Sequence, residues 1–365
     1  MRGTDKQQVT MLSLVTPDRR VPADHPLRRI KALADQALAA LSPTFDQMYS
    51  KVGRPSIPPE RLLKATLLMA FYSVRSERLL CEQLDYNLLF RWFLDMDMAE
   101  ESIDHSTFSR NRARLLEHEV AAKFLAEVVA MARGAKLMSD DHFTVDGTLI
   151  EAWAGVKSFR PKGENPADRE PPDDPGNPTV NFHGEKRSNA THESTTDPEA
   201  KLARKGNNQP AKLSYLANAL MENRNGLIVD LRVEPATGFG ERDGALAMLD
   251  QHVVGREGAT LGADAGYDVA DFVAAVRERG ITPHIAQTRD KRRRSAVDGR
   301  ATRHSGYEVS QRLRKRVEEI FGWTKTVACF RKTRFKGQVR TQLAAHLVAA
   351  AYNLLRIARL MAAPA

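Results

Sequence analysis

Cysteine is nearly absent from this sequence of 365 residues, and the only two, Cys81 and Cys329, lie far apart. Neither belongs to a Cys-x-x-Cys pair, which argues against a zinc site. Two cysteines also cannot build a disulfide framework, so we expect a protein of a reducing, cytoplasmic compartment.

Long apolar runs are lacking as well. No stretch reaches the roughly 20 apolar residues that a membrane-spanning helix requires, and the first 15 residues lack the apolar core of a signal peptide. The most apolar segment, 343–361, contains His346, Arg356 and Arg359. We therefore predict no membrane segment, and we interpret residues 346–365 as a C-terminal helix that is either buried or faces a partner.

Acidic residues are outnumbered by basic ones. The sequence has 46 Asp and Glu against 55 Lys and Arg, which gives a formal net charge of +9. A basic excess of this kind favours a partner that carries phosphate groups. Hydrophobic and charged contents of 42% and 28% are ordinary for a globular chain, and the length allows more than one domain.

The first 135 residues have a helical pattern and are predicted to form a separate all-α domain. Proline is tolerated at the start of a helix, so Pro58 and Pro59 predict a helix that begins there. Ser76 is placed to cap the next helix, and a third helical unit starts near Asp104 or Ser106.

Residues 136–345 alternate between strand-like and helical runs. Strands are predicted at 143–150, 211–223, 226–238, 259–264 and 281–287, and helices at 241–254 and 268–280. This order predicts an α/β fold in which helices flank a mixed sheet. The polar stretch 157–211 is almost free of aliphatic residues and is interpreted as an insertion or loop.

Two aspartates stand at the ends of strand-like runs. Asp146 is followed by Gly147, and Asp264 precedes Ala265 and Gly266. Ligands of α/β sheets bind at the carboxyl ends of strands, and a glycine lets the chain turn away and leave the carboxylate open. The alternative is that each aspartate only forms a turn or caps a helix.

A third acidic group lies in the helical pattern 307–330. Arg314, Glu318 and Lys325 are separated by steps close to one and two helical turns, which would place them on one face. The alternative reading is a salt bridge between Arg314 and Glu318 on a solvated helix.

Together these blocks resemble the DDE transposases of bacterial and archaeal insertion sequences, in the group called insertion sequence family five, akin to family four. The resemblance covers most of the chain: segment 52–97 in the helical domain, the two aspartate blocks 143–154 and 261–268, and the block 314–325. In that last block the family has Tyr, Arg, Glu and Lys at fixed spacing. Gln311 stands where the tyrosine is expected, which leaves the carboxylates intact.

The resemblance implies an RNase-H-like catalytic core in residues 136–345. It also implies that Asp146, Asp264 and Glu318 hold two Mg²⁺ or Mn²⁺ ions, which prefer hard oxygen ligands. Water would first free a 3′-hydroxyl at the transposon end, and that hydroxyl would then attack target DNA. Arg314 and Lys325 would hold phosphates beside the site.

Double-stranded DNA, as transposon terminal inverted repeats and target, is the expected partner. Further contacts are predicted from a recognition helix around 105–116 and from two basic runs. The residues are Arg110, Arg112, Arg114, Arg292, Arg293, Arg331, Lys332 and Arg334. Trp323 and Phe335 either stack on a flipped base or pack in the core. We also expect a homo-oligomer, because two DNA ends must be joined, with the C-terminal helix as a candidate interface.

Two other functions remain open from the sequence. One is a metal-dependent nuclease on the same core that does not transpose. The other is a DNA-binding regulator whose acidic residues are inert.

Overall fold

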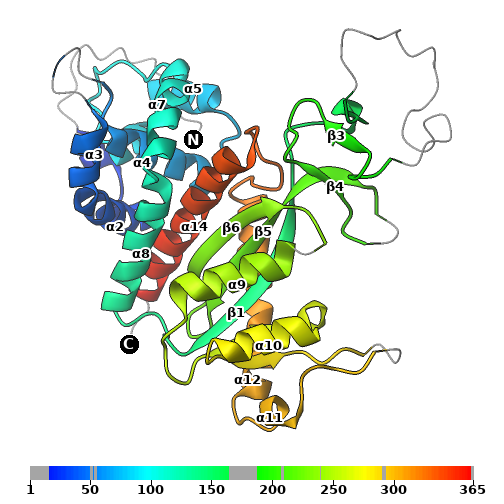
Figure 1. Cartoon of the computed structure of the whole chain (residues 1–365). Coiled ribbons are helices and arrows are strands. Elements are labelled where there is room, and N and C mark those ends of the chain that lie inside the picture. Colours follow the sequence, from blue (N-terminus) through cyan, green and yellow to red (C-terminus); the bar gives the residue numbers. More distant parts are fainter. Residues whose placement is uncertain are drawn as a thin grey trace, which may run out of the picture.

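A computed structural model describes residues 16–49, 52, 56–163, 187–206, 209–238, 240–289 and 293–362 (Figure 1). Its first part is helical, as the sequence predicts. The helices are α1 (Pro17–Arg20), α2 (Pro26–Ala40), α3 (Ser42–Met48), α4 (Pro59–Phe71), α5 (Glu77–Tyr86), α6 (Leu88–Phe93), α7 (His105–Glu117) and α8 (Val120–Gly134).

The predicted helix starts are confirmed by their caps. Helix α4 begins at Pro59. The Ser76 hydroxyl accepts a hydrogen bond from the Leu79 amide at 3.1 Å, and the Asp104 carboxylate accepts one from the Ser106 amide at 2.8 Å. Each cap satisfies an amide that has no partner inside its own helix.

Two helical units that the sequence presented as continuous are each broken in two. Asn87 ends α5 and caps α6, accepting from the amides of Leu89 and Phe90. Glu119 separates α7 from α8 because its backbone is left-handed, with φ of 51°. Apolar periodicity continues across both breaks, so the pattern alone does not reveal them.

A mixed sheet forms the second part of the chain. Its strands are β1 (His142–Glu151), β4 (Lys201–Ala203), β5 (Lys212–Glu222), β6 (Ile228–Pro235), β7 (Thr260–Ala263) and β8 (Thr282–Ile285). Strands β1, β5 and β6 are antiparallel neighbours, whereas β7 and β8 continue the sheet parallel to β1. The order β6-β5-β1-β7-β8, with β4 beside the start of β5, gives the RNase-H-like core that was predicted.

Helices cover the sheet and connect its strands. Helix α9 (Gly240–His252) packs against β1, β5 and β6, and α10 (Ala270–Glu278) follows β7. The predicted helical pattern 307–330 is not one helix. It consists of α12 (Tyr307–Leu313), the 3₁₀ turn η3 (Arg314–Arg316) and α13 (Val317–Thr326), and a short α11 (Gly299–Thr302) precedes it.

The last helix, α14 (Gln338–Leu360), lies between the N-terminal helices and the sheet (Figure 1). It contacts α2, α4 and α8 on one side and β6 on the other. Most of its residues are buried. It therefore does not offer the free apolar face that the sequence suggested for an interface between copies, and residue 346 lies inside it instead of at its start.

Polar side chains of α14 also close the outer edge of β6. The Asn353 amide accepts from the Ile228 N–H at 2.9 Å and donates to the Ile228 carbonyl at 2.8 Å. Gln342 binds the Val233 N–H and the Leu231 carbonyl in the same way, at 2.6 and 2.8 Å. An edge strand would otherwise present unpaired backbone groups.

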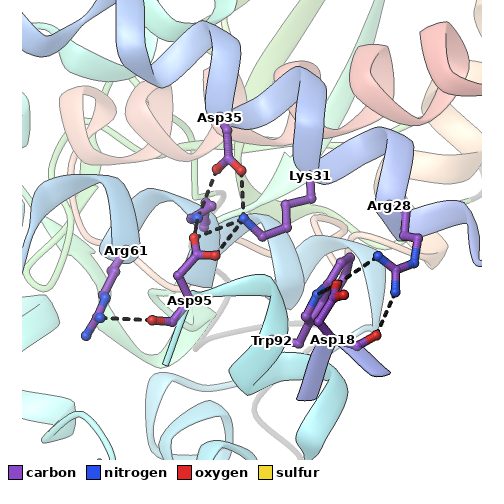
Figure 2. A network of polar contacts seen from close by, with 8 residues as sticks. Asp18, Arg28, Lys31, Asp35, Arg61, Trp92 and Asp95 are labelled. Atoms are coloured by element: carbon purple, nitrogen blue, oxygen red, sulfur yellow. Dashed lines mark hydrogen bonds and ion pairs between the residues drawn. The ribbon is translucent and has the colours of Figure 1, made fainter. Parts of the chain in front are cut away.

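A cluster of charges fastens the helical part (Figure 2). We call Lys31, Lys64, Asp35 and Asp95 the Lys64 cluster. The buried Lys64 ammonium pairs with Asp35 at 2.9 Å and with Asp95, and Lys31 pairs with the same two carboxylates at 2.7 and 2.8 Å. Because a buried ammonium requires acceptors, the cluster joins α2, α4 and the turn after α6.

Part of the predicted polar insertion 157–211 belongs to the described residues. Residues 164–186, 207 and 208 lie outside the described residues. The remainder holds the 3₁₀ turn η1 (Val156–Ser158), the paired strands β2 (Phe159–Pro161) and β3 (His192–Ser194), and β4. Among the described residues, no helix is both long and apolar enough to cross a membrane.

Candidate active site

Asp146 and Asp264 are neighbours across two parallel strands. In the β1–β7 pair, His142 lies opposite Thr260, and Thr144 lies opposite Gly262. Continuing that register by two residues places Asp146 level with Asp264, and adjacent strands are only about 4.8 Å apart. Side chains at level positions of parallel strands point to the same face, so the sheet brings the two predicted carboxylates together.

Local hydrogen bonds orient both aspartates. The Asp146 carboxylate accepts from the Gly147 amide at 2.8 Å. Asp264 caps the 3₁₀ turn η2 (Ala265–Tyr267) and accepts from the Gly266 amide at 2.7 Å. Asp264 therefore does form a turn, as the alternative interpretation expected. The turn uses only its Oδ1, and Oδ2 stays available.

Glu318 approaches the aspartates from α13. This helix packs against β1, and Glu318 is exposed in its first turn. Burial raises the pKa of the Asp146 carboxyl to about 7, and three nearby negative charges add to that rise. They belong to Asp264, Glu318 and Glu241. The predicted triad therefore shares one electrostatic environment.

Arg314 and Lys325 flank the triad in different ways. Arg314 lies in η3 instead of on the same helix as Glu318, and a Cβ atom added to Gly262 on β7 would lie 3.5 Å from the Arg314 Cβ. Its Nε donates to the Gln311 side chain at 3.0 Å, and Gln311 in turn donates to the His284 carbonyl. The residue that replaces the expected tyrosine thus positions Arg314 against the sheet.

Lys325 reaches β1 directly. Its ammonium donates to the Thr148 hydroxyl at 2.6 Å, two residues beyond Asp146 and on the same face. Burial and the positive charges of Lys205 and Arg331 lower the pKa of Lys325. The ammonium therefore lies on the face of β1 that carries Asp146.

Glu241 is an acidic residue of this site that the sequence reading missed. It lies in the first turn of α9, exposed to solvent. Burial and the charge of Asp264 raise its pKa. An acid in the first turn of a helix is common because it complements the helix dipole, so its sequence position gave no signal of a further role.

The donor set fits a hard divalent cation. Carboxylate oxygens are the ligands that Mg²⁺ and Mn²⁺ prefer, and a cation would neutralise the negative charges of Asp264, Glu318 and Glu241 that act on Asp146. In the described ranges, however, no three His, Cys, Asp or Glu side chains stand close enough to enclose an ion without moving. A binding ion would have to draw the carboxylates further together.

The basic residues predicted to contact DNA differ in how free they are. Arg110 and Arg114 are exposed on α7, and Arg114 lies over the Tyr49 ring at 5.2 Å. Arg112 is engaged: it pairs with Glu77 and stacks on Phe335 at 4.5 Å. Of the predicted recognition helix, two cations thus face solvent and one has a structural role.

The other basic residues lie closer to the carboxylates. Arg293 is exposed and donates to the Ala265 carbonyl at 3.5 Å, next to Asp264, whereas Arg292 lies outside the described residues. The segment 331–334 lies beside the end of β1, where the Glu151 amide donates to the Arg331 carbonyl at 3.0 Å. Three exposed cations, Arg331, Lys332 and Arg334, therefore border the site.

A cavity of about 540 Å³ lies between this basic segment and helices α4 and α7. Its lining includes Lys325, Phe335 and the exposed Trp153, over which the Lys332 ammonium lies at 5.7 Å. Phe335 is covered by two guanidinium groups. Trp323 instead packs edge-on against Tyr352 of α14, the core role that the sequence left open.

Comparisons with known proteins are consistent with this geometry. Two family models match the sequence: Transposase domain (DUF772) over residues 15–114, and Transposase DDE domain over residues 180–354. No curated protein matches it.

Two solved structures are distantly similar. A pre-cleavage Mos1 transpososome is 9% identical, covering 85% of this chain and 82% of that one, with a TM-score of 0.20. A Mos1 transposase paired-end complex with left transposon end is 10% identical, covering 77% and 81%, with a TM-score of 0.19. At TM-scores this low, neither likeness bears on the fold or the function.

Proposed function

Given that this chain is a DDE transposase, as its two family matches establish, we propose that Asp146, Asp264 and Glu318 are the carboxylates of its active site. Metal-dependent cleavage and joining of DNA strands is the activity of such an enzyme. The observation that supports the assignment is the β1–β7 register, whose last pair, Thr144 and Gly262, precedes Asp146 and Asp264 by two residues in each segment. The charge of Glu318 acts on the same Asp146 carboxyl.

Each residue has a role that its position supports. Asp146, at the centre of the cluster, would bridge two Mg²⁺ or Mn²⁺ ions, with Asp264 and Glu318 binding one each. Such ions activate the attacking oxygen and stabilise the leaving one. Lys325 and Arg314 bind the phosphate groups on either side of the scissile bond, Lys325 as a point charge and Arg314 as a planar fork.

The finer assignments rest on the motif spacing. We propose membership of insertion sequence family five, akin to family four, with transposon terminal inverted repeats and target DNA as partners. A homo-oligomer that pairs two ends is part of this proposal. Because most of α14 is buried, we propose that the interface between copies is formed by other elements. We also propose the helical part as the end-binding domain, with the exposed Arg110 and Arg114 as contacts.

Conservative substitutions test the triad. Asp146→Asn, Asp264→Asn and Glu318→Gln should each abolish strand cleavage and leave binding of a transposon end nearly unchanged, because they remove a charge and keep the shape. Glu319→Gln is the matched control, since this neighbouring acid is exposed and pairs with Arg356 at 3.7 Å. Cleavage that survives in one of the three would exclude that residue from the site.

A strand-transfer assay separates this function from the nuclease alternative. A transposase joins the freed 3′ end to target DNA, whereas a nuclease stops after cleavage. The readout is a joined product on a labelled target in the presence of Mg²⁺.

A further inference from the structure

Glu241 occupies space that exists only because residue 147 is glycine. A Cβ atom on Gly147 would lie 2.9 Å from both Cγ and Oε1 of Glu241, closer than carbon and oxygen atoms can approach without one of them moving. Gly147 directly follows Asp146 on β1. The start of α9 therefore delivers a carboxylate to the backbone beside the central aspartate.

Asn218 presents a second oxygen at the same place. It lies opposite Gly147 on β5 and is fully buried. Its Nδ2 donates to the Gly240 carbonyl at 3.1 Å, which fixes the orientation of the amide. Its Oδ1 has no hydrogen-bond partner, and it too would lie 2.9 Å from a Cβ on Gly147. The Glu241 carboxylate and the Asn218 Oδ1 therefore both lie against the backbone of Gly147.

Tyr267 adds an unpartnered hydroxyl beside the same acids. Its side chain is only 1% exposed, and its hydroxyl has no hydrogen-bond partner. Burial, followed by the negative charges of Glu241, Asp146 and Asp264, raises its pKa well above the ordinary value. Buried polar groups are nearly always satisfied, so the Asn218 Oδ1 and the Tyr267 hydroxyl each indicate a polar partner that the protein itself does not supply.

We propose that Glu241 is a fourth carboxylate of the active site and gives an oxygen to a divalent cation held beside Asp146 and Asp264. This inference rests on the proposed function. A cation, with the water it carries, satisfies the facing oxygens of Glu241 and Asn218, and the water can accept from the Tyr267 hydroxyl. Gly147 is then a requirement of the site, because any larger residue displaces the Glu241 carboxylate.

Mn²⁺ binding to the full-length protein tests the proposal without relying on activity. Free Mn²⁺ is followed by electron paramagnetic resonance during titration of wild type, Glu241→Gln, Asp146→Asn and Asp243→Asn. Asp243 is an exposed acid in the same first turn of α9, so its substitution controls for loss of charge at the helix start. Circular dichroism verifies that each variant is folded.

Glu241→Gln should weaken Mn²⁺ binding about tenfold or more, and Asp243→Asn should bind as wild type does. Gly147→Ala should reproduce the loss while Glu241 is still present. Wild-type binding by Glu241→Gln, or an equal loss in Asp243→Asn, overturns the fourth-carboxylate proposal. Unchanged binding by Asp146→Asn instead overturns the proposed function, so the two failures are distinguishable.

Discussion

His284 is a buried histidine whose neighbours favour the uncharged ring. It is fully buried on β8, and its Nδ1 forms a hydrogen bond with the Ser310 hydroxyl at 2.7 Å. Its Nε2 is buried without a partner, and the His304 ring lies 4.8 Å away. Burial, and then the charges of His304 and His142, lower the pKa of His284 to about 4.

This shift predicts a loss of stability in mild acid. The unfolded chain, with an ordinary pKa of 6.5, binds the proton more readily than the folded chain between pH 6.5 and about 4. The contribution of His284 to the free energy of unfolding, up to about 3 kcal/mol, is therefore fully present above pH 6.5 and is lost as the pH falls towards 4. Urea unfolding of wild type and His284→Gln between pH 7 and 4.5 measures the difference.

The variant should show the shallower pH dependence, because its glutamine cannot take up the proton. His105→Gln, at an exposed position of α7, serves as the control. Parallel pH curves for wild type and His284→Gln would mean that the folded protein accommodates a charged ring at this position.

Single residues also show how far the sequence could be read. The sequence placed Asp146 at the end of a strand, but β1 continues through Asp146 and Gly147 to Glu151, and only Asp264 directly follows its strand, β7. Glu241 was not predictable, because its closeness to Gly147 depends on α9 packing across β1. Pairings between residues so far apart in the chain are set by tertiary packing, which no local pattern encodes.

Among the elements, β6 and α14 depend on each other most directly. Ile228 at the start of β6 uses both of its outward backbone groups to bind Asn353, which is fully buried on α14. Water cannot replace a lost partner at this depth. The helix therefore takes the place of a further strand at the edge of the sheet.

Asn353→Leu should accordingly destabilise the fold by about 2–4 kcal/mol, because two buried backbone groups lose their partners while the branched shape of the side chain is kept. Arg359→Leu changes an exposed position of the same helix and should alter stability by no more than about 0.5 kcal/mol. Denaturant midpoints compare the two. Similar small effects in both variants would show that the edge of β6 does not need this side chain.

Sequence periodicity predicted which elements exist better than where they break. The run 307–330 has an uninterrupted helical pattern, yet η3 tightens its middle into a 3₁₀ turn at Arg314. Such a turn rotates residues on either side relative to one another. The spacing argument that put Arg314 and Glu318 on one helical face therefore fails in detail, even though both residues lie at the site.

At the scale of the whole molecule, part of the positive charge gathers beside the end of β1. The segment 331–334 and Lys325 lie beside the end of β1. Each cation that neutralises a DNA phosphate releases about one counterion. Binding of a DNA end should therefore weaken steeply as the salt concentration rises.

The double variant Arg331→Ala, Lys332→Ala should reduce the slope of log affinity against log salt by about 1–2. Arg279→Ala is the matched control, because Arg279 pairs with Asp250 at 2.7 Å away from this segment. The measurement is fluorescence anisotropy with a labelled DNA end at several salt concentrations. An equal change of slope in the control would assign the effect to overall charge.

The position of α14 along the chain has a consequence for biosynthesis. Every strand of the catalytic sheet leaves the ribosome before the residues that cover β6 are translated. Until residue 360 has emerged, the nascent polypeptide carries an open β-edge and an unfilled groove beside α8, and both invite contact with other chains. The sheet can thus be completed only after α14 has been translated. Until then, chaperones that bind nascent chains are expected to protect the open edge of β6.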